Sequence, residues 1–204
     1  MKVPFEERLP YPLLALLVLA VFYGIYFTKM LLQKRAGIQT RQIGRRNERR
    51  VHTVEVLMSV ATLGVVAAQL LSIVFQWNWM PANARFTGFW IGMIGDAIFL
   101  CSVICMKDSW RAGIPDKDKT RLVTDGIYKF SRNPAFLGFD LMYVGVLLLY
   151  GNFLTTGFTV FAVVMLHLQT LQEESYLAKT FGNPYLQYRA QVFRYLGRRK
   201  PQEK

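Results

Sequence analysis

Apolar residues collect in five long blocks along this chain, separated by short polar segments. The blocks cover residues 10–32, 54–76, 86–106, 134–150 and 153–172. A helix that crosses a bilayer needs about 20 mostly apolar residues. So many long uncharged runs in so short a chain disfavour the core helices of a soluble protein. The pattern predicts an all-α, polytopic membrane protein with about five transmembrane helices and a single membrane domain over residues 1–204.

The fourth and fifth blocks are separated only by Gly151 and Asn152. A Gly-Asn pair between two apolar runs is typical of a turn. We therefore expect the last two spans to form a tight helical hairpin.

Basic residues predict the orientation of the spans. The segment between the first two blocks contains Lys34, Arg35, Arg41, Arg45, Arg46, Arg49 and Arg50. The linker 77–85 has one basic residue and the hairpin turn has none. Loops rich in Lys and Arg stay in the cytoplasm. The N-terminus is then outside, and the C-terminus and segments 107–138 and 173–196 are cytoplasmic, at the cytoplasmic membrane if the source is prokaryotic.

The net charge of +12 raises the question of a nucleic-acid partner. The basic residues lie beside the spans and do not form one continuous soluble face. This distribution favours anionic lipid head groups as the partner and gives no support to nucleic acid.

The first cytoplasmic segment ends in Asn133-Pro134, which predicts the N-cap and the first turn of the fourth span. The positive end of that helix and Arg132 would together bind an anion. The alternative is that Asn133 only caps the helix while Arg132 extends to the lipid surface.

The second cytoplasmic segment continues the fifth helix as far as Gly182-Asn183-Pro184, and a short amphipathic helix follows. Glu173 shares a helix face with Leu177 and Phe181, where a carboxylate needs a cationic partner. Residues 198–200 are basic and predict a frayed tail.

These two segments together resemble the isoprenylcysteine carboxyl methyltransferase and phospholipid methyltransferase family. Its first pattern, Leu-Val-x-x-Gly-x-Tyr-x-x-x-Arg-His-Pro-x-Tyr-x-Gly, is matched by Leu122, Val123, Gly126, Tyr128, Arg132, Pro134 and Gly138. Its second, Glu-Glu-x-x-Leu-x-x-x-Phe-Gly-x-x-Tyr-x-x-Tyr, is matched by Glu173, Glu174, Leu177, Phe181, Gly182, Tyr185 and Tyr188. The run from Trp110 to Gly113 is similar to the prokaryotic branch. Asn133 replaces the family's His, and Phe136 replaces its Tyr.

The resemblance implies methyl transfer from S-adenosyl-L-methionine at a cytoplasmic site, formed by the loop before the fourth span and the C-terminal helices. It implies these cofactor-binding residues: Leu122, Val123, Gly126, Tyr128, Arg132, Asn133, Pro134, Glu173, Glu174 and Tyr185. Arg132, Glu173 and Arg111 are the expected catalytic residues, and Trp110, Arg111 and Arg189 are expected to bind the substrate. A carboxylate should hold the cofactor ammonium, and Arg132 or the helix N-terminus its carboxylate.

The acceptor is expected to be lipophilic or amphiphilic. The carboxylate of an isoprenylcysteine-like compound comes first, with a lipid amine or a small thiol as alternatives. Two other functions are also open: a sterol-type reductase that uses NADPH, and a non-catalytic lipid-binding scaffold with an altered site.

Several polar residues inside the spans have separate interpretations. Asp96 and Asp140 suggest helix-to-helix hydrogen bonds, a polar pocket or a pair with Lys29, and His167 suggests an interhelical contact. Cys101 and Cys105 are expected to be packing thiols, because no further ligand at suitable spacing supports a metal site.

Overall fold

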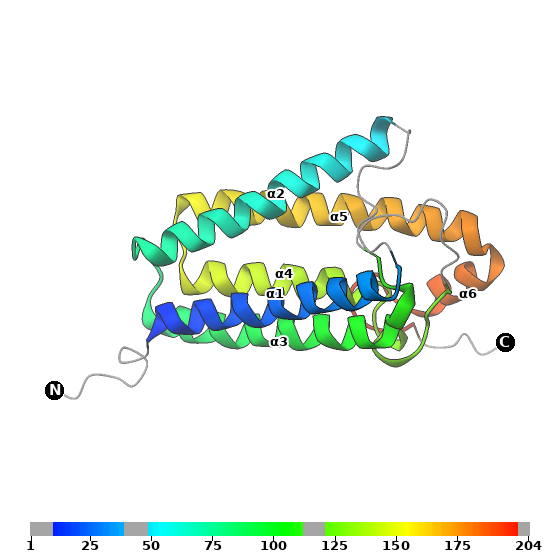
Figure 1. Ribbon diagram of the computed structural model, residues 1–204, viewed down its shortest axis with the longest axis horizontal. Coiled ribbons are helices and arrows are strands. Elements are labelled where there is room, and N and C mark those ends of the chain that lie inside the picture. The colour runs from blue at the N-terminus through cyan, green and yellow to red at the C-terminus, as the bar shows by residue number, and fades with distance from the viewer. Residues whose placement is uncertain (1–9, 39–48, 112–120, 200–204) are drawn as a thin grey trace.

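The computed structural model describes residues 10–38, 49–111 and 121–199. These residues form helices and contain no β-strand, apart from an isolated bridge between Val192 and Arg198. The α-helices are α1 (Tyr11–Arg35), α2 (Arg49–Val74), α3 (Ala82–Met106), α4 (Pro134–Leu149), α5 (Phe153–Phe181) and α6 (Asn183–Gln191). The short 3₁₀ helices are η2 (Lys107–Ser109) and η3 (Gly126–Lys129). The helices α1 to α5 lie along one long axis (Figure 1).

Within the described residues, 4 helices are long and apolar enough to cross a membrane: Tyr11–Arg35, Val51–Val74, Ala82–Ser109 and Phe153–Phe181. The helix Pro134–Leu149 is apolar but shorter. The predicted polytopic, all-α membrane fold is confirmed. α5 runs past the apolar block that ends at residue 172 and stops at Phe181, next to Gly182.

The closest packing in the bundle joins α3 to α4, and small residues make it possible. A Cβ atom added to Gly95 would lie 2.7 Å from the backbone N of Met142 and 2.8 Å from the backbone O of Gly138. A Cβ on Gly138 would lie 2.9 Å from the backbone O of Gly95. Close backbone approach through glycine is a common way for membrane helices to associate.

The hairpin between α4 and α5 is held by side-chain hydrogen bonds. The Asn152 side chain accepts a hydrogen bond from the backbone N of Thr155, and the Thr155 side chain accepts one from the backbone N of Asn152. The Asn152 amide also donates to Ser72 Oγ over 2.7 Å and to the Trp77 carbonyl over 2.9 Å. This capping box, with the contacts to Ser72 of α2 and to Trp77 beyond its end, fixes the turn that Gly151-Asn152 predicts.

α2 packs mainly against α5, whereas α1 packs against α3 and α4. α2 diverges from α1 toward the end of the bundle where α4 begins (Figure 1). We call this the site end, because the motif residues gather there.

Candidate active site

The C-terminal residues 192–199, which we call the C-terminal turn, pack on the loop that precedes α4. The backbone N of Arg132 donates to the Phe193 carbonyl and that of Asn133 donates to the Arg194 carbonyl, each over 3.1 Å. The turn is closed by Phe193 N, which donates to the Gly197 carbonyl over 2.9 Å. Arg198 forms a bridge with Val192, and the backbone N of Arg199 donates to the Gln191 carbonyl over 2.8 Å. The expected frayed tail is therefore wrong for residues 198 and 199, and residue 200 lies outside the described residues.

Glu174 is the centre of a buried cluster of charges. Its Oε1 accepts hydrogen bonds from Arg132 Nη2 at 2.8 Å, Arg132 Nε at 3.2 Å and Asn133 Nδ2 at 2.9 Å. Its Oε2 accepts from Arg194 Nη2 at 3.0 Å and Arg194 Nε at 3.2 Å. Both oxygens of this carboxylate are thus paired with guanidinium forks, a strong and directional arrangement.

Arg132 has further internal partners. Its Nη1 donates to the carbonyls of Arg189 and Val192, each over 3.0 Å. The Arg132 side chain is only 8% exposed, so the alternative in which it extends to the lipid surface is wrong. Arg132 joins the start of α4 to α5 and to the C-terminal turn, and most of its N–H groups are committed to this role.

Asn133 occupies the N-cap position of α4, but its side chain makes no capping hydrogen bond. The Asn133 amide donates instead to Glu174 and, over 3.2 Å, to the Arg194 carbonyl. The residue that departs from the family pattern therefore takes part in the buried cluster.

A cavity of about 410 Å³ lies beside this cluster. This is within the usual range of small-molecule sites, about 300–1,000 Å³. The predicted site residues that line it are Trp110, Arg111, Leu122, Val123, Tyr128, Arg132, Asn133, Glu173 and Tyr185.

Four predicted site residues are not part of the cavity wall: Gly126, Pro134, Glu174 and Arg189. Gly126 begins η3 with a φ of +59°, and Pro134 is buried at the first turn of α4. Arg189 contributes its carbonyl to the Arg132 side chain, and its own side chain is exposed. Of the two adjacent carboxylates, only Glu173 lines the cavity.

The polar end of the cavity contains residues that the sequence analysis missed. Gln169 and Arg121 line it, and Gln169 Nε2 donates to Glu173 Oε1 over 3.2 Å. Gln169 is one helical turn before Glu173, so the i, i+4 spacing on α5 would have predicted this neighbour. Among the described residues, neither Gln169 Oε1 nor the Tyr185 hydroxyl has a hydrogen-bond partner, although both are buried.

The tyrosines of the site are neutral donors. Burial raises the pKa of Tyr185 to about 12 and raises the pKa of Tyr128 and of Tyr188 further above the usual value. The Tyr188 hydroxyl donates to the Tyr128 carbonyl over 2.7 Å. None of these phenols is a base near neutral pH; they offer aromatic faces and O–H groups.

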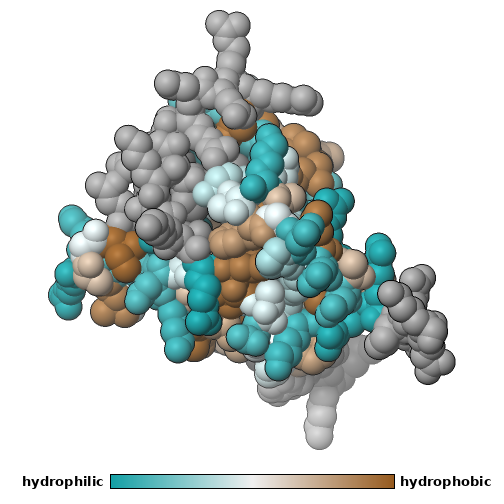
Figure 2. Space-filling model, turned by 90° about the vertical axis from the view of Figure 1, so that its right-hand side faces the viewer, coloured by the Kyte–Doolittle hydropathy of each residue, from teal (hydrophilic) through white to brown (hydrophobic). Residues whose placement is uncertain are grey.

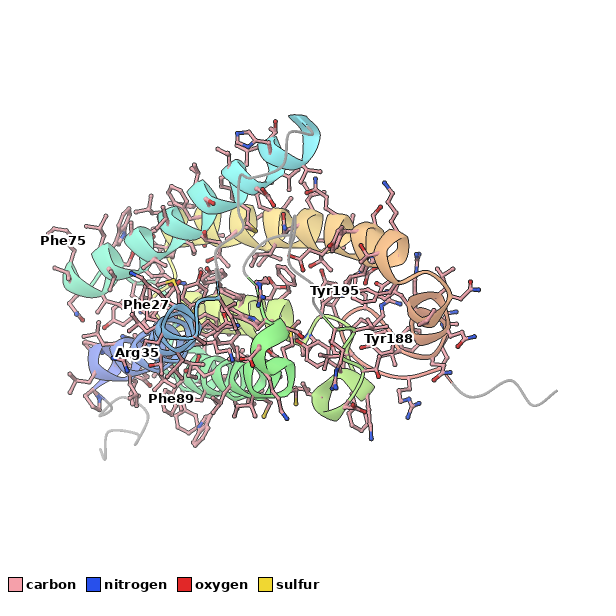
Figure 3. The ribbon with its side chains drawn as sticks, turned by 45° about the vertical axis from the view of Figure 1, so that its right-hand side comes forward. Phe27, Arg35, Phe75, Phe89, Tyr188 and Tyr195 are labelled. Atoms are coloured by element: carbon pink, nitrogen blue, oxygen red, sulfur yellow. The ribbon has the colours of Figure 1, made fainter. Side chains whose placement is uncertain are left out.

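The other end of the cavity is apolar and lies between α1 and α2. Tyr23, Phe27 and Met30 of α1 line it, together with Leu63 and Val66 of α2. Phe27 is 51% exposed and Leu63 is 70% exposed on the outer surface of the bundle. Because these residues belong to both surfaces, the cavity opens sideways where the two helices diverge (Figure 3). Seen from the site end, hydrophilic residues surround a hydrophobic strip (Figure 2).

The polar residues inside the spans lie apart from this cavity. Neither oxygen of Asp96 has a hydrogen-bond partner, and the structure shows no ion pair of Asp96 or Asp140 with Lys29 in the described part of the chain. His167 Nδ1 lies 2.6 Å from the Tyr195 hydroxyl, so its contact is with the C-terminal turn and not between spans. Cys101 and Cys105 are free thiols. No group of His, Cys, Asp or Glu that would hold a metal ion is found within 10–38, 49–111 and 121–199.

The fold and the cavity define a helical membrane protein with a cavity at one end of its bundle, lined by the motif residues. Residues 90–184 match the family described as phospholipid methyltransferase, a region that runs from α3 to the start of α6. This match confirms the resemblance that the motifs predict.

The chain is also similar to a protein that is named as a methyltransferase. Protein-S-isoprenylcysteine O-methyltransferase of Schizosaccharomyces pombe (strain 972 / ATCC 24843) is 40% identical over 74 residues, which are 35% of this chain. The match covers 30% of the length of that relative.

Proposed function

We propose that this protein is an integral membrane methyltransferase that transfers a methyl group from S-adenosylmethionine to a lipophilic or amphiphilic acceptor. One observation carries the proposal: a single cavity joins a polar end, lined by the family's motif residues, to an apolar end that opens between α1 and α2. In this arrangement a polar cofactor binds at one end and a lipid-like acceptor at the other, so that the methyl group can pass directly between them.

The polar end has suitable groups for S-adenosylmethionine. Glu173 is the partner for its ammonium, and the first turn of α4 at Ala135 and Phe136 offers backbone N–H groups to its carboxylate. Leu122 and Tyr185 provide apolar and aromatic surface for the adenine. The unpartnered oxygens of Gln169 and Tyr185 fit a ligand rich in donors and acceptors.

When bound, S-adenosylmethionine supplies an electrophilic sulfonium methyl group. The contribution of the protein is positioning and exclusion of water, since an ionised nucleophile needs no base and the tyrosines here are neutral. Arg111 and Arg121 line the same cavity and would hold an anionic acceptor group, while the apolar end takes its hydrocarbon part.

Among acceptors, we place the carboxylate of an isoprenylcysteine-like compound first. A carboxylate attacks without deprotonation, and the named activity of the matched relative is methylation of an isoprenylcysteine. A lipid amine or a small thiol would need to lose a proton first. We further propose that the site end faces the cytoplasm and the N-terminus the opposite side, in keeping with the basic segment between the first two spans.

Asn133 and Phe136 are compatible with this function. The hydrogen bond from Asn133 to Glu174 keeps the buried cluster complete, and Phe136 keeps an aromatic surface in the cavity wall. These contacts favour a working site over an altered scaffold.

The test is calorimetric titration of the detergent-purified protein with S-adenosylhomocysteine and, separately, with NADPH. We expect saturable binding of S-adenosylhomocysteine alone, followed by transfer of a labelled methyl group in an acceptor screen. Glu173→Gln should weaken binding, while Lys179→Gln, an exposed change on the same helix outside the cavity, should not. Binding of NADPH alone would support the reductase, and binding of neither to folded protein would support the scaffold.

A further inference from the structure

The start of α4 lies deeper in the bundle than the end of α5. Both helices leave the same tight turn, but α4 has 16 residues and α5 has 29. At about 1.5 Å per residue, α4 rises about 24 Å and α5 about 43 Å. The hydrocarbon core of a bilayer is about 30 Å thick. If the turn marks one boundary of this core, the loop before α4 lies about 6 Å inside the other boundary.

The C-terminal turn lies at the same depth as that loop. Its backbone pairs with the loop, as Gly197 N donates to the Phe130 carbonyl over 2.7 Å. A second contact places the turn at the same depth independently. The Tyr195 hydroxyl contacts His167, which lies about 21 Å from the start of α5 at the hairpin turn. Tyr195 lies on the bundle side of Tyr188 of α6 (Figure 3).

The turn and its loop present apolar side chains outward at this depth. Phe130 is 57% exposed, Phe193 is 43% exposed and Leu196 is 72% exposed. Lys129, Arg198 and Arg199 are exposed beside them, and the Arg199 guanidinium lies 5.6 Å from the centre of the Phe193 ring. Apolar residues bordered by long basic side chains are typical of segments that lie in a membrane interface.

We propose that the C-terminal turn and Phe130 form a membrane-seated surface whose partner is the anionic leaflet at the site end. Phe130, Phe193 and Leu196 contact acyl chains, and Arg198 and Arg199 contact anionic head groups. Arg194 of the same turn holds Glu174, so lipid contact also stabilises one wall of the site. This proposal does not depend on the identity of the reaction.

The depth of the turn is tested with spin labels on the full chain in vesicles of phosphatidylcholine and phosphatidylglycerol. Cys101 and Cys105 are first replaced by serine, and Leu196→Cys carries the label. Leu186→Cys is the matched control, since Leu186 is an exposed leucine on α6, beyond the end of α5. We expect the label at 196 to be several-fold more accessible to oxygen than to an aqueous nickel chelate, with the reverse at 186. Equal access of the chelate to both labels would overturn the membrane seat.

The head-group preference is tested by the double change Arg198→Gln and Arg199→Gln. Spin-labelled phosphatidylglycerol and phosphatidylcholine serve as probes of the lipid in contact with the protein. Each basic residue near the surface should strengthen association with anionic lipid about five-fold, so the double change should remove most of the preference. Lys179→Gln should leave the preference unchanged. A double variant with the original preference would refute the assignment of anionic lipid to this turn.

Discussion

Replacing Glu174 with glutamine tests whether Glu174 stabilises the buried cluster of charges and does not bind the ligand in the cavity. The Glu174 carboxylate is 3% exposed and accepts hydrogen bonds from Arg132, Asn133 and Arg194. A glutamine amide keeps one acceptor oxygen, turns an NH₂ group toward a guanidinium and removes the charge. Arg132 is then left as a buried cation without a counter-ion, whereas Arg194 is 31% exposed and can turn to water.

Breaking a buried ion pair by removing one partner costs about 3–5 kcal/mol. The lower figure applies to Glu174→Gln, because one of the two arginines is partly hydrated. For a chain of this length, about 3 kcal/mol lowers the melting temperature by about 6–12 °C. The assay is thermal unfolding in detergent, followed by intrinsic fluorescence, with Glu173→Gln as the neighbouring control. We expect the control to melt within about 4 °C of the unchanged protein, since a loss below about 1 kcal/mol shifts the melting temperature by no more than that.

This reasoning is refuted if Glu173→Gln lowers the melting temperature more than Glu174→Gln does. If Glu174→Gln melts normally and loses S-adenosylhomocysteine binding, then Glu174 and not Glu173 faces the ligand. A further check is Arg194→Met, which should cost less than Glu174→Gln because its removal leaves Glu174 paired with Arg132.

Three other outcomes follow from the same geometry. Glu173→Gln should weaken binding of S-adenosylhomocysteine about ten- to a hundred-fold, the worth of a charged hydrogen bond, and unchanged calorimetric affinity would remove Glu173 from the ammonium site. Arg132→Lys should lower the melting temperature by several degrees, because an ammonium cannot match both Glu174 and two carbonyls; an unchanged melting curve would contradict the clamp. Gly126→Ala should cost about 1–2 kcal/mol, since φ is +59° and the new Cβ would collide with Cys105 Sγ. Adding Cys105→Ala should relieve only the collision, and full recovery of the melting temperature would show that the backbone is not strained.

The residue patterns were sufficient for the fold but not for the roles within the site. The helix that carries Glu173 was predicted to continue to Gly182, and it does, because a glycine and a proline end it locally. The C-terminal turn was not predicted, because Phe193, Arg194 and Gly197 pair with a loop about sixty residues earlier in the chain. A short segment near a chain end has no local signal for such pairing.

The sequence by itself determined the membrane fold, the short hairpin and the set of motif residues that meet at the site end. It could do so because a long apolar segment in a bilayer satisfies its own backbone hydrogen bonds as a helix, and because caps and turns depend on neighbouring residues. Only the tertiary structure decided which of two adjacent carboxylates faces the cavity and which is enclosed by arginines. Successive residues on a helix point about 100° apart, so the surroundings of Glu173 and Glu174 depend on how α5 packs against α2, α4 and the C-terminal turn. Those contacts join distant parts of the chain, so no local pattern of residues reveals them.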